Sequence, residues 1–292
     1  MERLLLRKYL YPLLLLPPYP LKATLSDQYA FRPSGSTTSA LIFILSSISA
    51  MLETNPYIHL ITFDYSKAFD TVSHSSLMAQ MATVAFPDQF YNWVINFLTG
   101  RSHSTKFQSE ISLPASINAG VVQGSAIGPA AFSICISNYR PITPGNVGAK
   151  YADDMYLIIP SSNTASIPAE LSHINLWAAS NNLRLNTNKS AELIIKKPRN
   201  RTPDPPTHPD LPRVSSLKVL GITLQSNLLM SEHVDNVVAK AGQALYALKV
   251  IKSHGLPTHL LHLVTNASLV SALTYASPAW IGFTNSSDLA RL

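Results

Sequence analysis

Three aspartates in the sequence follow apolar segments and could bind a metal ion together. Asp153 and Asp154 stand side by side within the otherwise apolar stretch "VGAKYADDMYLIIP". Asp64 directly follows the apolar run "YIHLITF", and Asp70 comes six residues later. A pair of aspartates alone is more often a simple turn, because aspartate tolerates turn conformations. The second acidic segment favours a site, since carboxylates that meet at one sheet edge raise each other's pKa values unless a cation compensates them.

The chemistry that suits this set is phosphoryl transfer assisted by magnesium. Mg²⁺ prefers carboxylate oxygens together with water and substrate phosphates, so two or three aspartates suffice as protein ligands. Two such ions about 3.5–4 Å apart stabilise the attacking and leaving oxygens of an in-line displacement. A polymerase and a metal-dependent nuclease could both use these carboxylates, but only the nuclease would cleave nucleic acid without added nucleotides. A zinc site is not expected at His254, His259 and His262, which lack cysteine or acidic company.

Two further features accompany the predicted site. The loop "AGVVQGSAIGPAAF", which contains Gly120, Gln123 and Gly124, lies between an expected strand and an expected helix. Its glycines would let the backbone approach a base pair closely, although the loop matches neither the P-loop nor the dinucleotide glycine pattern. Phe69, five residues after Asp64, could press on a sugar near the metal, or it could be an ordinary core residue.

The elements that must position these residues are strands and helices that do not alternate strictly. Residue patterns predict strands at 57–63, 116–122, 191–197 and 216–224. They predict helices at 75–85, 88–98, 128–139, 167–180 and 231–252. The apolar arms around Asp153 predict a hairpin, and the proline-rich segment 198–213 predicts a surface loop. This order is typical of an α+β fold, with an antiparallel sheet and helices on one face.

The expected helix at 231–252 carries an apolar stripe with basic residues beside it. Lys240 and Lys249 stand on the two shoulders of the stripe. The helix could therefore contact nucleic acid, or it could be an ordinary surface helix whose lysines reach into solvent. The residues of the stripe are Val234, Val237, Val238, Ala241, Leu245 and Leu248.

Charge is sparse and uneven along the chain. Only 13% of the 292 residues are charged, and the net charge is +6. Residues 1–180 hold ten Lys or Arg and ten Asp or Glu, whereas residues 181–292 hold twelve and six. A basic final third suits binding to a polyanion such as nucleic acid, although a basic surface can also serve solubility alone. The single cysteine, Cys135, excludes an internal disulfide framework.

The N-terminal stretch "MERLLLRKYLYPLLLLPPYPL" is expected to form a helix that ends in a proline-rich loop. Arg7 and Lys8 split its apolar run, and Pro12, Pro17 and Pro18 break the rest, which argues against a signal peptide or a membrane span. We therefore expect an intracellular protein of the nucleus or cytoplasm, neither secreted nor bound to a membrane.

Six segments, in order, resemble the reverse transcriptases of non-LTR (LINE-type) retrotransposons. They are "QYAFRPSGSTTSALI" (28–42), "FDYSKAFDTVSH" (63–74), "GVVQGSAIGP" (120–129), "YADD" (151–154), "LRLNTNKSAELII" (183–195) and "LKVLGITL" (217–224). The resemblance covers nearly the whole chain and implies the right-hand polymerase architecture. Residues 1–55 would form partial fingers and the entry to the palm, 56–225 the palm, and 226–292 a helical thumb and connection segment.

The resemblance also implies an activity and roles for individual residues. The activity would be that of an RNA-directed DNA polymerase, which uses deoxynucleoside triphosphates to extend a DNA primer on an RNA template. Asp64, Asp153 and Asp154 would bind two Mg²⁺ ions, for which Mn²⁺ could substitute. Nucleotide contacts would come from Phe69, as a steric gate against a 2′-hydroxyl, and from Gln123, Gly124 and Lys189. Template and primer contacts would come from Arg32, from Leu220 and Gly221 in the primer-grip hairpin, and from Lys240 and Lys249.

The chain departs from the family pattern in two respects. Val122 stands where the family has a proline before Gln123, and this replacement loosens a turn. Few residues precede "QYAFR", so the resemblance implies an N-terminally truncated domain without the complete fingers, the endonuclease domain or the Cys/His-rich tail. The alternative to an active polymerase is a catalytically inactive fragment of an element that retains only nucleic-acid binding.

Overall fold

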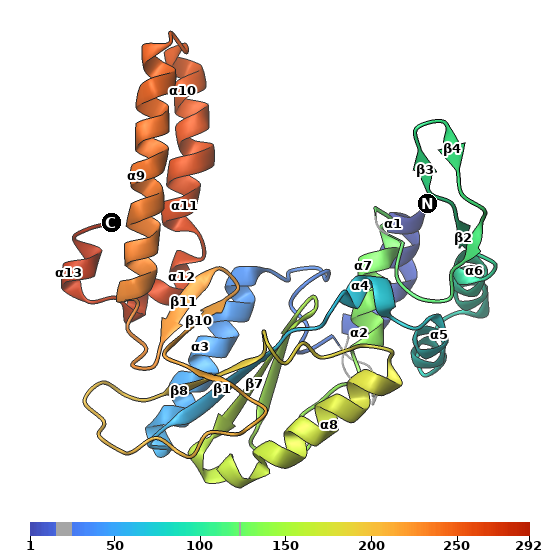
Figure 1. Ribbon diagram of the computed structural model, residues 1–292, viewed down its shortest axis with the longest axis horizontal. Helices are drawn as coiled ribbons and strands as arrows, with labels where there is room; N and C mark the ends of the chain where they lie inside the picture. Colours follow the sequence, from blue (N-terminus) through green and yellow to red (C-terminus); the bar gives the residue numbers. More distant parts are fainter. Residues whose placement is uncertain (16–24, 123) are drawn as a thin grey trace. The chain divides into compact units, whose positions relative to one another are not determined.

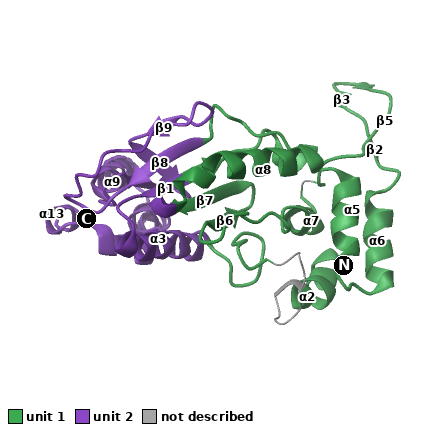
Figure 2. Cartoon of the chain, turned by 90° about the horizontal axis from the view of Figure 1, so that it is seen from below, with its two compact units in different colours: residues 1–36, 61–159, 163–190 green, residues 37–60, 160–162, 191–292 purple. Residues whose placement is uncertain are grey.

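The computed structural model describes residues 1–15, 25–122 and 124–292, which form two compact units that interleave along the chain (Figures 1 and 2). Unit 1 comprises residues 1–36, 61–159 and 163–190, and unit 2 comprises residues 37–60, 160–162 and 191–292. The division passes through strand β1 (Ile58–Phe63), which contributes residues to both units. The domain borders expected after residues 55 and 225 stay a prediction.

The sheet of unit 1 is built around the expected hairpin. Strands β6 (Val147–Tyr151) and β7 (Asp154–Pro160) pair antiparallel, with Tyr151 opposite Asp154, and β7 is followed in strand order by β1. Every residue of β7 after Asp154 is buried, as its apolar run requires. The hairpin predicted from the two apolar arms is thus confirmed.

The helices of unit 1 follow local sequence signals. Ser73 caps α5 by accepting a hydrogen bond from the Ser76 N–H group, and Pro87 precedes the first residue of α6. Helix α7 is buried almost throughout and packs against α5. The predicted N-terminal helix is confirmed as α1 (Glu2–Leu5), a π-helical stretch (Leu6–Leu10) and α2 (Tyr11–Leu15). The other predicted helices of this unit are confirmed as α5 (His74–Ala82), α6 (Asp88–Leu98), α7 (Ile127–Cys135) and α8 (Ile167–Ser180). The proline-rich loop expected after α2 falls largely on residues 16–24, outside the described residues.

The strand predicted at 116–122 is wrong for most of its length. Only Ala115–Ser116 forms a strand, β5, which pairs with β2 (Ser102–His103) in a ribbon that continues through β3 (Lys106–Phe107) and β4 (Glu110–Ile111). After β5 the backbone bonds to loops and helix ends instead of to a ladder, since Gly120 N–H donates to Val72 C=O and Val121 N–H to Phe69 C=O. Alternating apolar residues therefore mark an extended segment here and not a strand.

The sheet of unit 2 is mixed, which corrects the expectation of a purely antiparallel sheet. The strand order is β1, β8 (Ala191–Ile195), β9 (Arg213–Val214), and β8 and β9 run parallel with Glu192 opposite Arg213. Parallel neighbours need a long connection. The proline-rich segment 198–213, expected only as a surface loop, supplies it and returns beside β8.

Helix α3 (Thr37–Thr54) forms the core of unit 2. Of the helices that the structure describes, it alone is long and apolar enough to cross a membrane by length and composition. Six of its residues are buried, however, and helix α12 (Ser277–Trp280) packs against it. We therefore interpret α3 as a core helix.

The remainder of unit 2 is a hairpin followed by helices. The strand predicted at 216–224 is instead two antiparallel strands, β10 (Ser216–Val219) and β11 (Ile222–Gln225), because Leu220 and Gly221 both adopt positive φ and form a turn. The helix predicted at 231–252 is confirmed as α9 (Ser231–Ser253), and it packs against α10 (Thr258–Thr265) and α11 (Ser271–Thr274) (Figure 1). Its apolar stripe is buried only in part, since Leu245 is 54% exposed.

Candidate active site

Asp64 lies directly after the last residue of β1, as predicted. Its backbone is fixed by the segment that leads into β8: its N–H group donates to Ser190 Oγ at 3.4 Å, and its carbonyl accepts from Asn186 N–H at 2.8 Å. Tyr65, the next residue, pairs with Leu185 in an isolated β-bridge. The end of β1 and residues 185–190 therefore form one supported platform.

Asp153 and Asp154 lie at the turn of the β6–β7 hairpin. Tyr151 and Asp154 close the ladder, so Ala152 and Asp153 form a two-residue turn between them. Ala152 has φ +55°, which brings the chain round within two residues. This geometry places one aspartate in the turn and the next at the start of β7.

The three carboxylates share one electrostatic environment. Partial desolvation raises the pKa of Asp154 to about 6, and the charges of Asp153 and Asp64 contribute to the rise. Desolvation also raises the pKa of Asp153, with a further contribution from the charge of Asp64. The charge of Asp64, which follows one strand, thus acts on both aspartates of the hairpin. The shared site of three carboxylates stays a prediction.

The carboxylates do not form a closed metal cage. Among the described residues, no group of three or more His, Cys, Asp or Glu side chains is arranged so that it could hold a metal ion by itself. Their chemistry nevertheless fits Mg²⁺, because this ion takes carboxylate oxygens and fills its remaining positions with water and substrate phosphates. Two metal ions at these residues stay a prediction.

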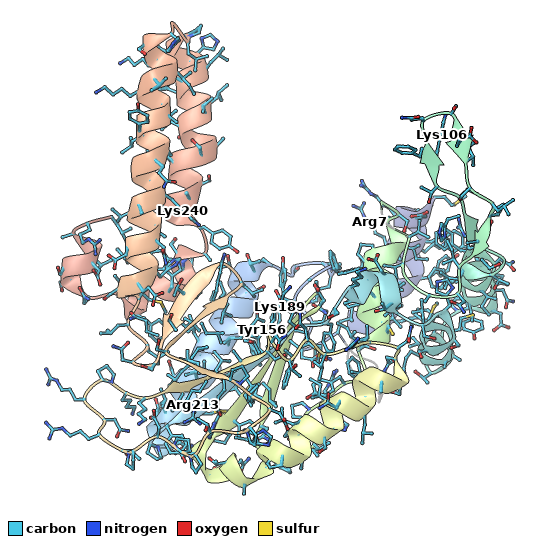
Figure 3. All side chains as sticks on the ribbon, in the orientation of Figure 1. Arg7, Lys106, Tyr156, Lys189, Arg213 and Lys240 are labelled. Atoms are coloured by element: carbon cyan, nitrogen blue, oxygen red, sulfur yellow. The ribbon has the colours of Figure 1, made fainter. Side chains whose placement is uncertain are left out.

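Lys189 forms an ion pair with one of these acids. Its Nζ atom lies 3.8 Å from Asp64 Oδ2 (Figure 3 labels this lysine). The side chain is 69% exposed, so the ion pair is a weak one that a stronger anion could replace. The structure therefore brings together the lysine and the aspartate that the sequence placed in separate segments.

Phe69 sits in the short helix α4 (Ala68–Thr71), after Lys67, which adopts a left-handed backbone conformation. Its ring stacks on Phe132 with centroids 4.3 Å apart and meets Phe31 edge to face at 6.1 Å. Phe132 is fully buried, whereas Phe31 is exposed. Phe69 is thus a half-buried ring that packs against the buried Phe132. This placement is compatible with both predictions for Phe69, a core residue and a residue that contacts a sugar.

The glycine-containing loop is held against α4. Gly120 has φ +85°, and a Cβ atom at this position would lie 2.8 Å from the Asp70 carbonyl oxygen, so glycine is required for this close approach. Gly124 also has a positive φ, with open space around its Cα. Gln123, predicted to contact the templating pair, lies outside the described residues.

Two residues that support the hairpin escaped the sequence reasoning. Gln28 is fully buried, and its side-chain amide bonds to the backbone of Ala152. Lys150 in β6 is also buried, and its Nζ atom donates to the carbonyls of Ile136 and Tyr139, both at 2.9 Å. Burial lowers the pKa of Lys150 to about 8. The roles of Gln28 and Lys150 could not be predicted, because both side chains bond to backbone groups, which leave no signature in the sequence.

The predicted template residue Arg32 is engaged within unit 1. Its Nη1 atom donates to the Leu25 carbonyl at 2.6 Å, and its guanidinium lies over the Tyr29 ring at 4.9 Å. These contacts tie residues 25–32 into a compact turn. A contact of Arg32 with the template stays a prediction.

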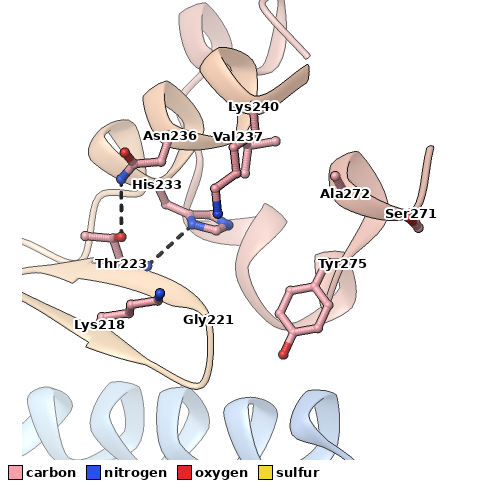
Figure 4. A pocket seen from close by; sticks show the side chains of 10 residues that line it. All are labelled: Lys218, Gly221, Thr223, His233, Asn236, Val237, Lys240, Ser271, Ala272 and Tyr275. Atoms are coloured by element: carbon pink, nitrogen blue, oxygen red, sulfur yellow. Dashed lines mark hydrogen bonds between the residues drawn. The ribbon is translucent and has the colours of Figure 1, made fainter. Parts of the chain in front are cut away.

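The other predicted template and primer residues belong to unit 2. Lys240 and Gly221 line a pocket of about 660 Å³ between the β10–β11 turn and α9, together with Lys218, His233 and Tyr275 (Figure 4). Tyr275 OH donates to the Leu220 carbonyl at 2.9 Å, which fixes the turn. Lys249 is exposed farther along α9. The structure therefore gathers Leu220, Gly221 and Lys240 beside the N-terminal half of α9.

Comparison with known proteins shows the family to which the chain belongs. Residues 8–224 match the family described as reverse transcriptase (RNA-dependent DNA polymerase). The chain belongs to the reverse transcriptase family. The matched region includes all three aspartates and Lys189. Reverse transcriptases use divalent metal ions and bind an RNA template, which agrees with the carboxylates and basic residues described above.

Curated relatives confirm the non-LTR retrotransposon type. The chain is 30% identical over 228 residues to the RNA-directed DNA polymerase from mobile element jockey of Drosophila melanogaster, covering 74% of this chain and 25% of that protein. It is 27% identical over 240 residues to a probable RNA-directed DNA polymerase from transposon BS of the same species, covering 76% and 26%. This reverse transcriptase chain thus spans about a quarter of the length of these relatives.

Solved structures support the fold. Telomerase from Candida albicans, solved in complex with a TWJ fragment of telomeric RNA, superposes with a TM-score of 0.52 at 10% identity, covering 89% of this chain and 46% of that one. Apo telomerase from Candida tropicalis, truncated from its C-terminal domain, gives 0.51 at 11% identity, covering 68% and 39%. At such identities the likeness concerns the fold alone, and it confirms the α+β class of this reverse transcriptase.

Proposed function

We propose that this chain is the RNA-directed DNA polymerase domain of a non-LTR retrotransposon, transferring nucleotides from deoxynucleoside triphosphates to the 3′-hydroxyl of a DNA primer. The observation that carries the proposal is the placement of Asp64 after β1 and of Asp153 and Asp154 at the β6–β7 turn, with Lys189 beside Asp64, in a chain that matches the reverse transcriptase family. Carboxylates that raise one another's pKa gain most from a bound cation. Metal-assisted phosphoryl transfer is the chemistry that such a set serves.

Asp64, Asp153 and Asp154 are the residues that would hold two Mg²⁺ ions, or Mn²⁺ in their place. When bound, these ions would supply charge stabilisation for the attacking and leaving oxygens. The three side chains offer hard oxygen ligands from two strand ends, leaving coordination positions for water and phosphate. The protein's own task is to present these oxygens at a fixed place, because little covalent chemistry falls to it.

The nucleotide would lie among the residues around these carboxylates. Lys189 would turn from Asp64 to the triphosphate, which offers the stronger anionic partner. Phe69, backed by Phe132, would exclude a sugar with a 2′-hydroxyl by contact with its ring. Gln123 and Gly124 would approach the templating pair through the backbone of their loop.

Template and primer would follow the basic residues. Arg32 would support the template side, while Leu220, Gly221, Lys240 and Lys249 would contact the primer through its backbone. In the right-hand architecture, unit 1 would then supply most of the palm with partial fingers, and α9 to α11 would form the thumb. Binding through phosphates implies an affinity that falls steeply with salt concentration.

Primer extension on an RNA template tests this proposal. The wild type should extend a DNA primer when Mg²⁺ and deoxynucleotides are present, and Asp153→Ala should not. Equal absence of extension in both would favour the inactive fragment. In that case, salt-dependent binding of a primer–template duplex would show what the basic third retains. Cleavage of nucleic acid without added nucleotides would favour the nuclease.

A further inference from the structure

The turn that carries Asp153 holds an unusual backbone conformation. Ala152 has φ +55° and is not a glycine. An L-residue with a side chain is disfavoured in this region because its Cβ atom crowds the following carbonyl. Such a conformation persists only where the surroundings impose it, and it is a reason to look for what holds it.

The side-chain amide of Gln28 holds Ala152 through both its N–H and its carbonyl group. Its Oε1 atom accepts from Ala152 N–H at 3.1 Å, and its Nε2 atom donates to the Ala152 carbonyl at 3.4 Å. The same Oε1 atom accepts from Ala30 N–H at 2.9 Å. Gln28 is 0% exposed, so water does not compete for these bonds. The amide thus clamps the turn residue through two opposite groups.

The clamp itself is anchored to β6. Residues 27–29 run beside this strand: Lys150 N–H donates to the Asp27 carbonyl at 2.7 Å, and Tyr29 N–H donates to the Lys150 carbonyl at 2.9 Å. The buried Lys150 Nζ atom lies 3.1 Å from Asp27 Oδ2. Gln28, between these bonded neighbours, therefore has a fixed position relative to the hairpin, so its amide can impose a conformation on the turn.

We propose that Gln28 is a positioning residue of the catalytic hairpin: its amide holds Ala152 in the left-handed conformation that presents Asp153 and Asp154 toward Asp64. This inference rests on the proposed function, because it assigns a purpose to the three carboxylates. It concerns a residue that touches neither substrate nor metal and acts only through the backbone of Ala152.

The test uses Gln28→Met, which keeps the length of the side chain and removes all three hydrogen bonds. Electron paramagnetic resonance measures the affinity of the purified chain for Mn²⁺ without nucleotide. In Gln28→Met this affinity should fall about tenfold, as is usual when a group that orients metal ligands is lost. Hydrogen exchange of the Ala152 amide should accelerate. Asn181→Leu, which removes a buried amide from the end of α8, is the matched control and should change neither quantity.

A second substitution separates clamping from general stability. Glycine adopts positive φ without steric cost, so Ala152→Gly should restore at least part of the Mn²⁺ affinity lost in Gln28→Met. A merely structural Gln28 would give additive effects, with no rescue by glycine. Additivity, or Mn²⁺ binding by Gln28→Met equal to the wild type, would overturn the proposal.

The two proposals fail in different ways. If Asp153→Ala binds Mn²⁺ as the wild type does, the metal site of the proposed function is wrong. The exchange rate of the Ala152 amide still tests the clamp in that case, because it needs neither metal nor activity. An unchanged rate in Gln28→Met would show that the amide does not hold the turn, whatever the chain catalyses.

Discussion

The ammonium nitrogen of Lys189 lies 3.8 Å from Oδ2 of Asp64, although the two residues are 125 positions apart in the sequence. Both residues belong to the platform formed by the end of β1 and residues 185–190. The backbone of this platform is fixed, since Asn186 N–H donates to the Asp64 carbonyl. The lysine side chain, in contrast, is mostly exposed and can turn. A fixed backbone with an exposed, mobile ammonium group suits a lysine that exchanges one anionic partner for another.

Replacing this lysine should therefore weaken nucleotide binding and leave folding intact. In Lys189→Met the KM for deoxynucleotide should rise about tenfold, the usual loss for one hydrogen bond to a charged group. The free energy of unfolding should change by less than about 0.5 kcal/mol, because an exposed ion pair contributes little. Steady-state primer extension and urea denaturation measure the two quantities. Lys106→Met, at an exposed position in β3, is the control and should keep the KM of the wild type. A wild-type KM in Lys189→Met would contradict the role of Lys189.

The aromatic stack predicts sugar discrimination. In Phe69→Val the gate is smaller, so ribonucleotides should be incorporated at least about tenfold better relative to deoxynucleotides, a selectivity of the size that one steric contact provides. Incorporation of each nucleotide by the variant and the wild type gives the ratio. Phe107→Ala, which removes an exposed ring on the β3–β4 ribbon, should leave the ratio unchanged. An unaltered ratio in Phe69→Val would mean that this ring only packs against Phe132.

The sequence predicted the parts of this site that depend on local pattern. Asp64 after a buried strand, and Asp153 between two apolar arms, could be placed because strand periodicity and turn preference are local properties. The clamp of Gln28 on Ala152 could not be predicted, since its partner is a backbone group 124 positions away. For the same reason the prediction of a strand at residues 117–122 is wrong: the backbone groups that bond this segment, at Val72 and Phe69, are distant in sequence.

The raised pKa of Asp154 predicts how stability depends on pH. The folded carboxyl binds its proton up to about pH 6, whereas the unfolded one releases it near its ordinary value of 3.8. The contribution of the Asp154 carboxyl to stability should therefore fall as pH rises from about 4 to 7. Because Asp154 is exposed, we expect a loss of only about 1 kcal/mol after solvent screening. Urea denaturation at the two pH values should show a smaller loss in Asp154→Asn, and equal slopes would contradict the coupling.

A buried ion network should matter much more for stability than a surface pair in the same unit. Glu192 is 1% exposed; its carboxylate lies 2.6 Å from His59 Nδ1 and accepts from Arg213 Nε at 2.7 Å (Figure 3 labels Arg213). Burial alone would raise the pKa of Glu192, but the hydrogen bonds from His59 and Arg213 outweigh it and lower the pKa. The carboxylate thus stabilises the fold above the ordinary value of 4.5, and this contribution is lost as pH falls below it.

Glu192→Gln should accordingly cost about 3 kcal/mol of unfolding free energy at pH 7, because it leaves a buried charge partly unpaired. Asp204→Asn is the matched control: Asp204 pairs with Lys196 but is 56% exposed, so its loss should cost less than about 1 kcal/mol. Thermal and urea denaturation give both values. Equal costs would mean that burial does not strengthen the Glu192 network.

Two glycines with positive φ separate the effect of backbone strain from that of close packing. At Gly100 (φ +67°) no atom lies within 4 Å of a Cβ position, so Gly100→Ala should cost only about 1 kcal/mol, the penalty for a side chain in the left-handed region. At Gly120 (φ +85°) the new Cβ would also meet the Asp70 carbonyl oxygen at 2.8 Å. Overpacking adds roughly 1–3 kcal/mol, so Gly120→Ala should cost at least twice as much. Since Gly120 holds the loop against α4, this variant should also slow primer extension, whereas Gly100→Ala should not. Denaturation together with extension rates decides, and similar costs for the two variants would rule out the contact with Asp70 as the reason for glycine.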